Sequence, residues 1–369
     1  MTAAGRLAAE KAQMVSLLHL PGVTTRGLRE ALALFGSPAG AWEAFRSGDA
    51  RSYAPSFADW TREAPRIDPA SLMDSLEAAG IDVVVAGEAG YPTALSAIHD
   101  PPLALFYRGA LPGGMTCVSI VGSRKATTYG LEAARWLAEG LACHGLCVVS
   151  GAAYGIDSAA HAGALDGSGH TIAVLGCGVD VVYPRRNAAL FARIVERGCL
   201  LSEYIPVTEP RAYQFPARNR IIAGLSAATI VVEASERSGA LLTADFALAE
   251  NRDVLAVPGQ IFSANSAGTH GLIRSGAAAV CSVEDVLAEM GIDAEARSHD
   301  NESRSPAGGL GEGERRLLEA LEGGPCDLEG LCANAGLSAA AASAALSSLE
   351  VRGLVKRSAG GVFQKCRPR

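Results

Sequence analysis

Short apolar runs alternate with helical segments between residues 70 and 290, and this alternation constrains the fold more than any other feature of the sequence. The runs are continuously apolar and rich in β-branched residues, which is typical of strands buried on both faces. The segments between them, such as YGLEAARWLAEGLACHG at 129–145, have the pattern of amphipathic helices. We therefore predict an α/β domain with a doubly wound, mostly parallel sheet. The predicted strands are 81–87, 116–122, 146–151, 171–176, 228–234 and 253–259.

Residues 1–65 are predicted to form a small helical domain. Within it, LLHLPGVTTRGLREALALFG at 17–36 has the pattern of two helices joined by a tight turn, with Thr24 or Thr25 capping the second helix. The pattern resembles a helix-hairpin-helix, whose turn amides and following helix can face a DNA phosphate. Since only Arg26 and Arg29 are basic nearby, the hairpin either contacts DNA or serves for packing alone.

A second small domain is predicted at the C-terminal end. A polar segment rich in Ser, Gly and Pro, residues 291–311, is expected to link it to the α/β domain at 66–290. Residues 312–369 follow the order helix, helix, helix, hairpin, which is that of a winged helix. The third helix is nearly all Ala, Ser and Leu and lacks side chains that read base edges. Only Lys356 and Arg357, beside the wing, are suitable, so we expect a packing or protein-contact module.

The composition excludes several classes of protein. A chain of 369 residues with 49% hydrophobic residues can bury a core and is not disordered. No run of about 20 apolar residues could span a membrane, and the N-terminus has no secretory signal pattern. The nine cysteines match no zinc or disulfide framework, so we expect a cytoplasmic protein with reduced thiols and no bound metal.

The charge balance leaves nucleic-acid binding open. A net charge of −7 argues against a generally basic nucleic-acid binder. Affinity for phosphate, however, depends on local basic patches and not on the sum over the chain. The basic residues are mostly Arg, which binds phosphate through two parallel hydrogen bonds.

Glycine- and serine-rich loops follow four of the predicted strands. Because ligands of doubly wound sheets bind beyond the carboxyl ends of the strands, these loops are predicted to meet at one edge. Glycines let backbone amides approach a ligand, the helices that follow can point N–H groups at a phosphate, and cationic side chains add donors. The sequence thus predicts a phosphate-bearing ligand. The candidate residues are Gly122, Ser123, Arg124 and Lys125; Ser150, Gly151, Tyr154, Gly155 and Asp157; Arg185, Arg186 and Asn187; and Ser238 and Gly239.

Aromatic and basic residues interleave in YQFPARNRIIAG at 213–224, as on surfaces that bind single-stranded nucleic acid. The candidates in this segment are Phe215, Arg218, Asn219 and Arg220. Arg218 and Arg220 are two residues apart, so they point in different directions from a helix. At most one is expected to face the ligand directly. The other is expected to pair with a carboxylate such as Glu203 or Glu233.

Motifs for cofactor and nucleophile chemistry are missing. There is no Walker sequence, and Gly176-Cys177-Gly178 is only a fragment of the dinucleotide-binding pattern, so no cofactor is predicted. His161 could act as a base near Asp157, although we expect a structural histidine. Ser150 and Ser238 lack the surroundings of a nucleophile elbow, and we expect both to donate hydrogen bonds to phosphate.

Taken in order, these loops resemble those of the DprA/Smf family of DNA-processing proteins. The resemblance covers about residues 70–290 and consists of strings that are highly specific as a set. The strings are YPTALSAIHDPPLALFYRGAL (91–111), VGSRKATTYG (121–130), SGAAYGIDSAAH (150–161), LGCGVDVVYPRRN (175–187), LSEY (201–204), FPARNRIIAGLS (215–226), VVEASERSGALLTA (231–244), VPGQ (257–260) and GTHGLIRSGA (268–277).

The resemblance implies an extended Rossmann domain that binds single-stranded DNA and forms homodimers. It also implies a protein without enzymatic activity that protects incoming DNA and loads the RecA recombinase during natural transformation and recombination. The basic pocket of the family implies DNA contacts by Arg124, Arg185, Arg186, Arg218 and Arg220. One departure is Tyr154, because the family more often has a basic residue there; a tyrosine could stack on a base instead.

Two other functions stay open. One is a nucleotide-binding Rossmann enzyme of the lysine-decarboxylase-like type, which hydrolyses nucleoside monophosphates. Such enzymes carry a P-G-G-x-G-T-x-x-E loop, and the corresponding ASERSGALLTA at 234–244 lacks the paired Gly and the Glu. Release of free base from a nucleotide would support that reading. The other is a nucleotide sensor with a winged-helix output, which would bind a mononucleotide tightly without affinity for DNA.

Overall fold

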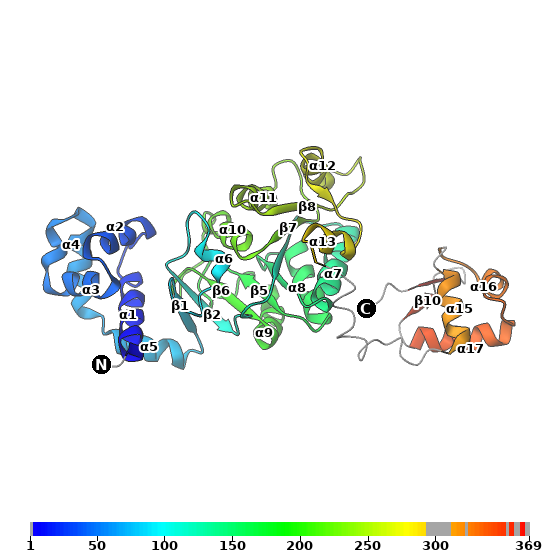
Figure 1. Ribbon diagram of the computed structural model, residues 1–369, viewed down its shortest axis with the longest axis horizontal. Coiled ribbons are helices and arrows are strands. Elements are labelled where there is room, and N and C mark those ends of the chain that lie inside the picture. The colour runs from blue at the N-terminus through cyan, green and yellow to red at the C-terminus, as the bar shows by residue number, and fades with distance from the viewer. Residues whose placement is uncertain (1–2, 293–310, 322–323, 352–353, 358–361, 366–369) are drawn as a thin grey trace. The chain divides into compact units, whose positions relative to one another are not determined.

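The chain forms two compact units, Met1–Gly291 and Ile292–Arg369. The computed structural model describes residues 3–292, 311–321, 324–351, 354–357 and 362–365. The first unit contains a group of N-terminal helices and a nine-stranded sheet (Figure 1). The predicted linker at 291–311 lies outside the described residues except at its two ends.

The N-terminal helices pack around a cluster of aromatic side chains. Trp42, Phe45, Phe57 and Trp60 are each at most 2% exposed, and the rings of Phe45 and Phe57 meet edge to face with centroids 5.2 Å apart. Such contacts allow a unit this small to hold a core of its own. The helices are α1 (Ala3–Leu18), α2 (Thr25–Phe35), α3 (Pro38–Ser47), η1 (Asp49–Ser52), α4 (Pro55–Glu63), η2 (Ala64–Arg66) and α5 (Pro69–Ala78).

The helical hairpin between α1 and α2 has the predicted cap. Thr24 accepts a hydrogen bond from the amide of Gly27 at 3.1 Å. Arg26 forms an ion pair within its own helix, and Arg29 lies 2.7 Å from a carboxylate oxygen of Asp100. Both arginines beside the hairpin therefore have protein partners, which favours the packing role over DNA contact.

The sheet contains all six predicted strands and three more. Its order is β1-β2-β6-β5-β4-β3-β7-β8-β9; β1, β2 and β6 pair antiparallel, and the pairs from β6 to β9 are parallel. The unpredicted strands, β2, β6 and β9, contain no Val, Ile or Thr, so they lack the β-branched pattern by which the other six are recognised. The strands are β1 (Asp82–Val85), β2 (Ala104–Gly109), β3 (Cys117–Val121), β4 (Cys147–Ser150), β5 (Thr171–Val174), β6 (Cys199–Ser202), β7 (Ala228–Val231), β8 (Asp253–Ala256) and β9 (Ala278–Ala279).

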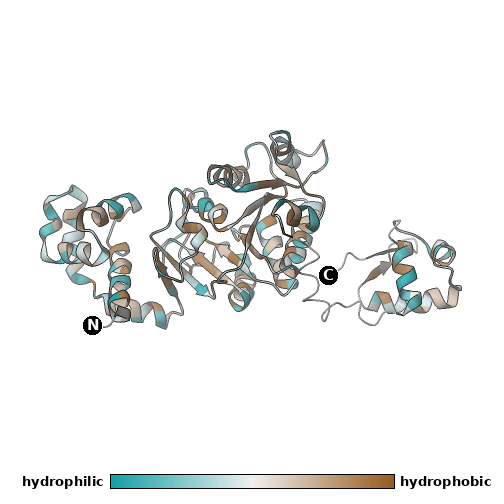
Figure 2. Cartoon of the chain, viewed as in Figure 1, coloured by the Kyte–Doolittle hydropathy of each residue, from teal (hydrophilic) through white to brown (hydrophobic). Residues whose placement is uncertain are grey.

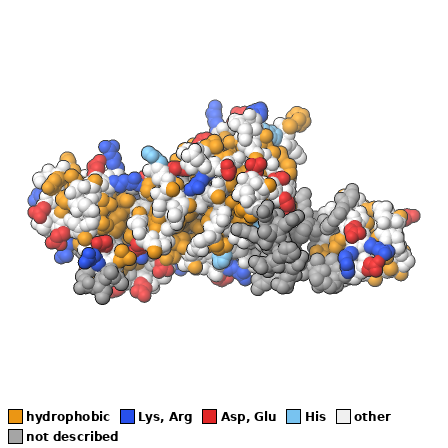
Figure 3. Space-filling view, in the orientation of Figure 1, with side chains coloured by type: hydrophobic (Ala, Val, Ile, Leu, Met, Phe, Trp, Pro, Cys, Tyr) orange, Lys and Arg blue, Asp and Glu red, His pale blue; other side chains and the backbone are white. Residues whose placement is uncertain are grey.

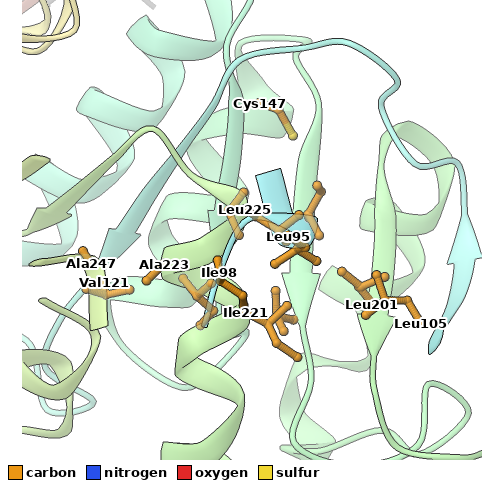
Figure 4. Packing of buried hydrophobic residues seen from close by; sticks show 14 of the residues in the cluster. Leu95, Ile98, Leu105, Val121, Cys147, Leu201, Ile221, Ala223, Leu225 and Ala247 are labelled. Atoms are coloured by element: carbon orange, nitrogen blue, oxygen red, sulfur yellow. The ribbon is translucent and has the colours of Figure 1, made fainter. Parts of the chain in front are cut away.

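Helices cover both faces of the sheet, as the uniformly apolar strands require. Along β5, Ile172 and Val174 pack in one cluster with Ile221 of α10, whereas Ala173 packs in another with Phe191 of α9. Figure 4 shows Ile221 in the first cluster, and Figure 2 shows the strands as the most apolar part of the unit. The helices are α6 (Thr93–Ser96), α7 (Thr128–Cys143), α8 (Ile156–Asp166), η3 (Arg185–Asn187), α9 (Ala188–Arg197), α10 (Gln214–Leu225), α11 (Gly239–Ala249), η4 (Ala264–Ser266), α12 (Ala267–Arg274) and α13 (Val283–Glu289).

The order of the strands changes direction between β3 and β7. From β3 the chain proceeds outward through β4, β5 and β6, and it then crosses back to β7 and continues through β8 to β9. The loops that follow β3 and β7 therefore diverge at the carboxyl edge of the sheet. Such a switch point is where doubly wound sheets have a crevice for ligands.

The second unit has the predicted order of a winged helix. It consists of α15 (Glu312–Ala320), α16 (Leu328–Ala335), α17 (Ala339–Val351), β10 (Val355–Arg357) and β11 (Phe363–Lys365), with the two strands antiparallel. Leu317, Leu331 and Leu349 lie in its core, each fully buried. The turn of the predicted hairpin, at residues 359–361, lies outside the described residues. On α17 the exposed positions are mainly Ala and Ser, so this helix offers few groups for reading bases.

The surface shows no continuous basic field in the view of Figure 3, where acidic and basic side chains are interspersed. Among the described residues no single helix is long and apolar enough to cross a membrane. Only one pair of helices, Leu328–Ala335 and Ala339–Glu350, has the length and composition of a membrane span, and the pair is sharply bent.

Candidate functional site

A cleft of ≈ 730 Å³ opens at the switch point between β3 and β7. Residues from the loop after β3, from α8, from α10 and from the loop after β7 line it. The sequence-predicted members are Gly122, Ser123, Arg124, Lys125, Asp157, Phe215, Arg218, Asn219, Ser238 and Gly239. The loops that the sequence placed at one edge are therefore brought together there.

The loop after β3 is folded over the end of β7 by hydrogen bonds. Ser123 donates its amide to the carbonyl of Glu233 at 2.7 Å, and the buried carboxylate of Glu233 accepts the amide of Thr127 at 2.9 Å. Gly122 is required for space, since a Cβ would lie 2.6 Å from Cγ1 of Ile156. Glu233 is thus a structural residue and has no arginine partner among the described residues. The result is a tight loop that leaves Arg124 exposed at its tip.

Arg124 lies over an aromatic surface at the edge of the cleft. The guanidinium carbon is 5.5 Å from the ring centroid of Phe215, and that ring is 5.4 Å from the ring of Tyr183. Tyr154 joins these residues around a smaller cavity of ≈ 40 Å³. Tyr154 and Tyr183 are 44% and 45% exposed, so both have ring surface available to a ligand. A cation held against aromatic rings offers both charge and a stacking surface.

The floor of the cleft holds a buried pair of opposite charges. Arg218 is 3% exposed and Asp157 is 6% exposed. Burial raises the pKa of the Asp157 carboxyl, and the charge of Arg218 opposes that rise. Burial also lowers the pKa of Arg218 to about 10, so it stays protonated at neutral pH. The charge of Arg218 is therefore buried beside a carboxyl, whereas Arg124 and Lys125 are the exposed cations of the cleft.

The starts of the neighbouring helices already have protein acceptors. At α8 the amide of Ile156 donates to the carbonyl of Ser123 at 3.2 Å. Thr127 caps α7 and Ser238 caps α11, the latter by accepting the amide of Ala240 at 3.3 Å. The capping contact uses the Ser238 oxygen as acceptor, so its hydroxyl hydrogen is still free to donate, and the predicted contact with phosphate stays a prediction. The exposed cationic side chains are therefore the stronger candidates for binding an anion here.

Three residues predicted to contact the ligand, Ser150, Asn187 and Arg220, have structural roles instead. Ser150 is fully buried and donates its hydroxyl to the carbonyl of Ile120 at 2.6 Å. Asn187 donates to the carbonyl of Ala152 at 3.0 Å. Both side chains therefore point inward and hold the backbone near the sheet edge in place, beneath the loops that were predicted to contact the ligand.

Arg220 is the third of these, and it forms ion pairs away from the cleft. Its Nε lies 3.0 Å from Asp100, and one Nη lies 2.5 Å from Glu203. The expected pairing of one arginine with Glu203 is thereby confirmed. Because Asp100 also pairs with Arg29, this network joins α10 to the N-terminal helices.

Arg185 and Arg186 lie on η3 next to the aromatic surface. Both are exposed, neither lines the cleft, and neither forms an ion pair with another described residue. They follow Tyr183 and Pro184 in the chain, so they extend the positive charge beyond the rim of the cleft. Gly151 and Gly155 form the ends of the loop that carries Tyr154, and the φ of Gly155, +78°, is one that favours glycine.

His161 is a structural residue, as expected. The ring is fully buried, and its Nδ1 lies 2.7 Å from the hydroxyl of Thr171. Burial lowers its pKa to about 3. Within the described residues no group of three or more His, Cys, Asp or Glu side chains could hold a metal ion.

Asn265 is a cleft residue that the sequence did not indicate. It lies in η4, donates to the backbone carbonyl of Lys125 at 3.0 Å, and accepts the amide of Ala234 through its own carbonyl at 2.7 Å. It therefore joins the loops after β3 and β7 across the switch point. No local pattern marks such a residue, because its role depends on two segments distant in sequence.

A doubly wound domain with a cationic, aromatic-lined cleft at its switch point defines an α/β protein of the kind whose ligands bind at that crevice. The chain matches the family model of DNA recombination-mediator protein A over residues 82–291 and that of the DprA winged helix domain over residues 301–361. It belongs to the DNA recombination-mediator protein A family, DprA/Smf, as the sequence motifs predicted.

Curated relatives and solved structures agree with this assignment. The chain is 48% identical over 201 residues to DNA processing protein DprA of Streptococcus pneumoniae, which covers 54% of this chain and 71% of the relative. A DprA relative from Mycobacterium tuberculosis is 43% identical over 239 residues, 64% of this chain; the match spans 61% of that relative's length, less than two thirds.

The X-ray structure of DNA processing protein A from Streptococcus pneumoniae superposes with a TM-score of 0.66 at 37% identity, covering 75% of this chain and 97% of that one. A structure of DNA processing protein A from Helicobacter pylori, whose single-stranded DNA binding mode it addresses, has a TM-score of 0.51 at 29% identity. It covers 57% of this chain and 95% of that one.

Proposed function

We propose that this chain binds single-stranded DNA in the cleft between β3 and β7 and acts as a recombination mediator without enzymatic activity. The observation that carries the proposal is the exposed Arg124, held over Phe215 at the rim of the cleft. Lys125 lies beside it, and neither cation forms an ion pair with another described residue. Phosphates would therefore find both cations available.

The aromatic rim favours single strands over duplex. Tyr154, Tyr183 and Phe215 present ring surfaces, and an unpaired base can stack on them whereas a base within a duplex is already stacked on its neighbours. Arg185 and Arg186 extend the positive charge past the rim, where a strand longer than the cleft would continue. Affinity is thus expected to depend on salt and only weakly on sequence.

Protein partners form a finer part of the proposal. Family membership supports a homodimer that protects incoming DNA and loads the RecA recombinase in transformation and recombination. The candidate nucleophiles of the cleft support a binding role: Ser150 is buried under the sheet edge, and Ser238 caps α11.

The test is fluorescence anisotropy with a labelled poly-dT oligonucleotide across a salt series, with duplex DNA as competitor. Binding should prefer the single strand and weaken steeply with salt. Arg124→Ala should weaken binding and lower the slope of log affinity against log salt by about 0.7. Arg62→Ala, an exposed arginine on α4, is the matched control and should leave both unchanged.

Other outcomes would contradict parts of the proposal. Equal affinity in Arg124→Ala would exclude the cleft as the DNA site. Release of free base from a nucleoside monophosphate would instead support the hydrolase. Light scattering tests the dimer, and displacement of a single-strand-binding protein by RecA on coated DNA tests loading.

A further inference from the structure

Arg218 lies at the floor of the cleft, and three of its five N–H groups donate to the protein. One Nη donates to the carbonyl of Gly151 at 2.7 Å and to the carbonyl of Val174. Its Nε donates to Oδ1 of Asn219 at 3.0 Å. The acceptors belong to the loop after β4, to the end of β5 and to α10. A single side chain therefore connects three segments that are far apart in sequence.

The two carbonyl groups explain why a charged donor is useful at this place. Gly151 and Val174 lie at the carboxyl ends of adjacent strands, which is the edge that faces the ligand. A buried carbonyl without a donor is destabilising, and its partial negative charge would also repel a phosphate. Arg218 satisfies both carbonyls, and its 3% exposure leaves almost no surface for a ligand.

Gly151 is fitted to this arrangement. A Cβ at this position would lie 2.2 Å from one Nη of Arg218 and 2.5 Å from its Cζ. The φ of Gly151 is not in the left-handed region, so glycine is needed here for space and not for backbone conformation. The close approach of the loop to the guanidinium thus depends on both residues.

We propose that Arg218 is a positioning residue of the DNA-binding cleft and does not contact DNA phosphate. It fixes the loop 151–155 against α10, so that Tyr154 from the loop and Phe215 from the helix stand together beside Arg124. The inference rests on the proposed function, because it assigns a role within the same cleft.

Gly151→Ala is the informative variant, because it keeps every charge and displaces only the guanidinium. Its affinity for poly-dT should fall at least about tenfold, the effect of losing a charge-assisted hydrogen bond, while the salt slope stays at the wild-type value. Arg218→Met should weaken binding similarly, and the double variant should be no weaker than the weaker single one, since both break one contact. Arg124→Ala, by contrast, should lower the slope.

Hydrogen exchange on the DNA-free protein supplies a readout that is independent of binding. Gly151→Ala and Arg218→Met should speed amide exchange in 151–157 and 214–219, whereas Arg124→Ala should not. If Arg218→Met unfolds, Arg218→Lys replaces it, because one ammonium reaches fewer acceptors than a guanidinium and gives a smaller effect of the same kind.

The outcomes separate the two proposals. A slope reduced in Arg218→Met as much as in Arg124→Ala would show direct phosphate contact and overturn the positioning role. Unchanged affinity of folded Gly151→Ala, or unchanged exchange in both segments, would overturn it as well. Failure of the wild-type protein to bind any oligonucleotide at low salt would refute the proposed function, while the exchange data would still decide the positioning role.

Discussion

Acid should destabilise the fold through His161, because the ring is held neutral inside the α/β unit. The hydroxyl of Thr171 donates to the carbonyl of Val148 at 2.7 Å, so Nδ1 of His161 must supply the hydrogen of its 2.7 Å contact with that hydroxyl. Nε2 is then the unprotonated nitrogen, buried and without a partner in the described structure. A proton added there would be a buried charge without an acceptor.

The size of the effect follows from the two pKa values. The folded pKa of His161 is about 3, against 6.5 for an unperturbed imidazole. Since the folded value is depressed, the stability contribution is present above pH 6.5 and is lost as the pH falls toward 3. At pH 4.5, two units below the unfolded value, the loss is about 3 kcal/mol, since each unit corresponds to roughly 1.4 kcal/mol.

Urea denaturation at pH 7 and pH 4.5 measures this loss. His161→Asn retains a donor near the Nδ1 position but cannot titrate, and its smaller volume should lower stability at pH 7. Its decrease in unfolding free energy between the two pH values should nonetheless be about 3 kcal/mol smaller than that of the wild type.

A matched control is His170→Asn, which removes an exposed histidine of the same unit. It should show the same decrease between pH 7 and pH 4.5 as the wild type, because it leaves the buried ring of His161 in place. An equal decrease in wild type and His161→Asn would refute the buried, neutral ring.

Three further substitutions test particular contacts. Gly122→Ala places a Cβ 2.6 Å from the side chain of Ile156 and should lower the free energy of unfolding by about 1–3 kcal/mol in chemical denaturation. Wild-type stability would show that the loop can move to accommodate the methyl group. Asp100→Asn removes the carboxylate between two arginines and should cost about 1 kcal/mol in thermal unfolding, whereas Asp59→Asn, from an ion pair exposed at both ends, should have no measurable effect. Tyr154→Arg adds a cation to the rim and should raise the salt slope of poly-dT binding by about 0.7. An unchanged slope would show that the DNA strand does not pass this position.

Much of the architecture follows from local pattern. The six apolar runs, the helical segments between them and the winged-helix order are all present in the structure. The loops after β3 and β7 also meet as expected, since parallel strands bring their carboxyl ends to one edge. The antiparallel β2 and its neighbour β6 escaped prediction because neither contains a β-branched residue, so only their pairing in the sheet defines them as strands.

The roles of individual polar residues depend on contacts that local pattern does not encode. Ser150 and Asn187 stand in loops that look alike in the sequence, yet both side chains turn inward to backbone carbonyls. Arg218 and Arg220 come from one helix, and the structure directs the first to the sheet edge and the second to Asp100 and Glu203.

By itself, the sequence determined the α/β class, the edge of the sheet that carries the site and the kind of ligand the loops suit, because these depend on periodicity and on residue types close together in the chain. Only the tertiary structure decided which cations stay available to an anion. Availability is set by burial and by acceptors brought from distant segments: Arg124 lies exposed over Phe215, while Arg218 lies buried against two strand ends.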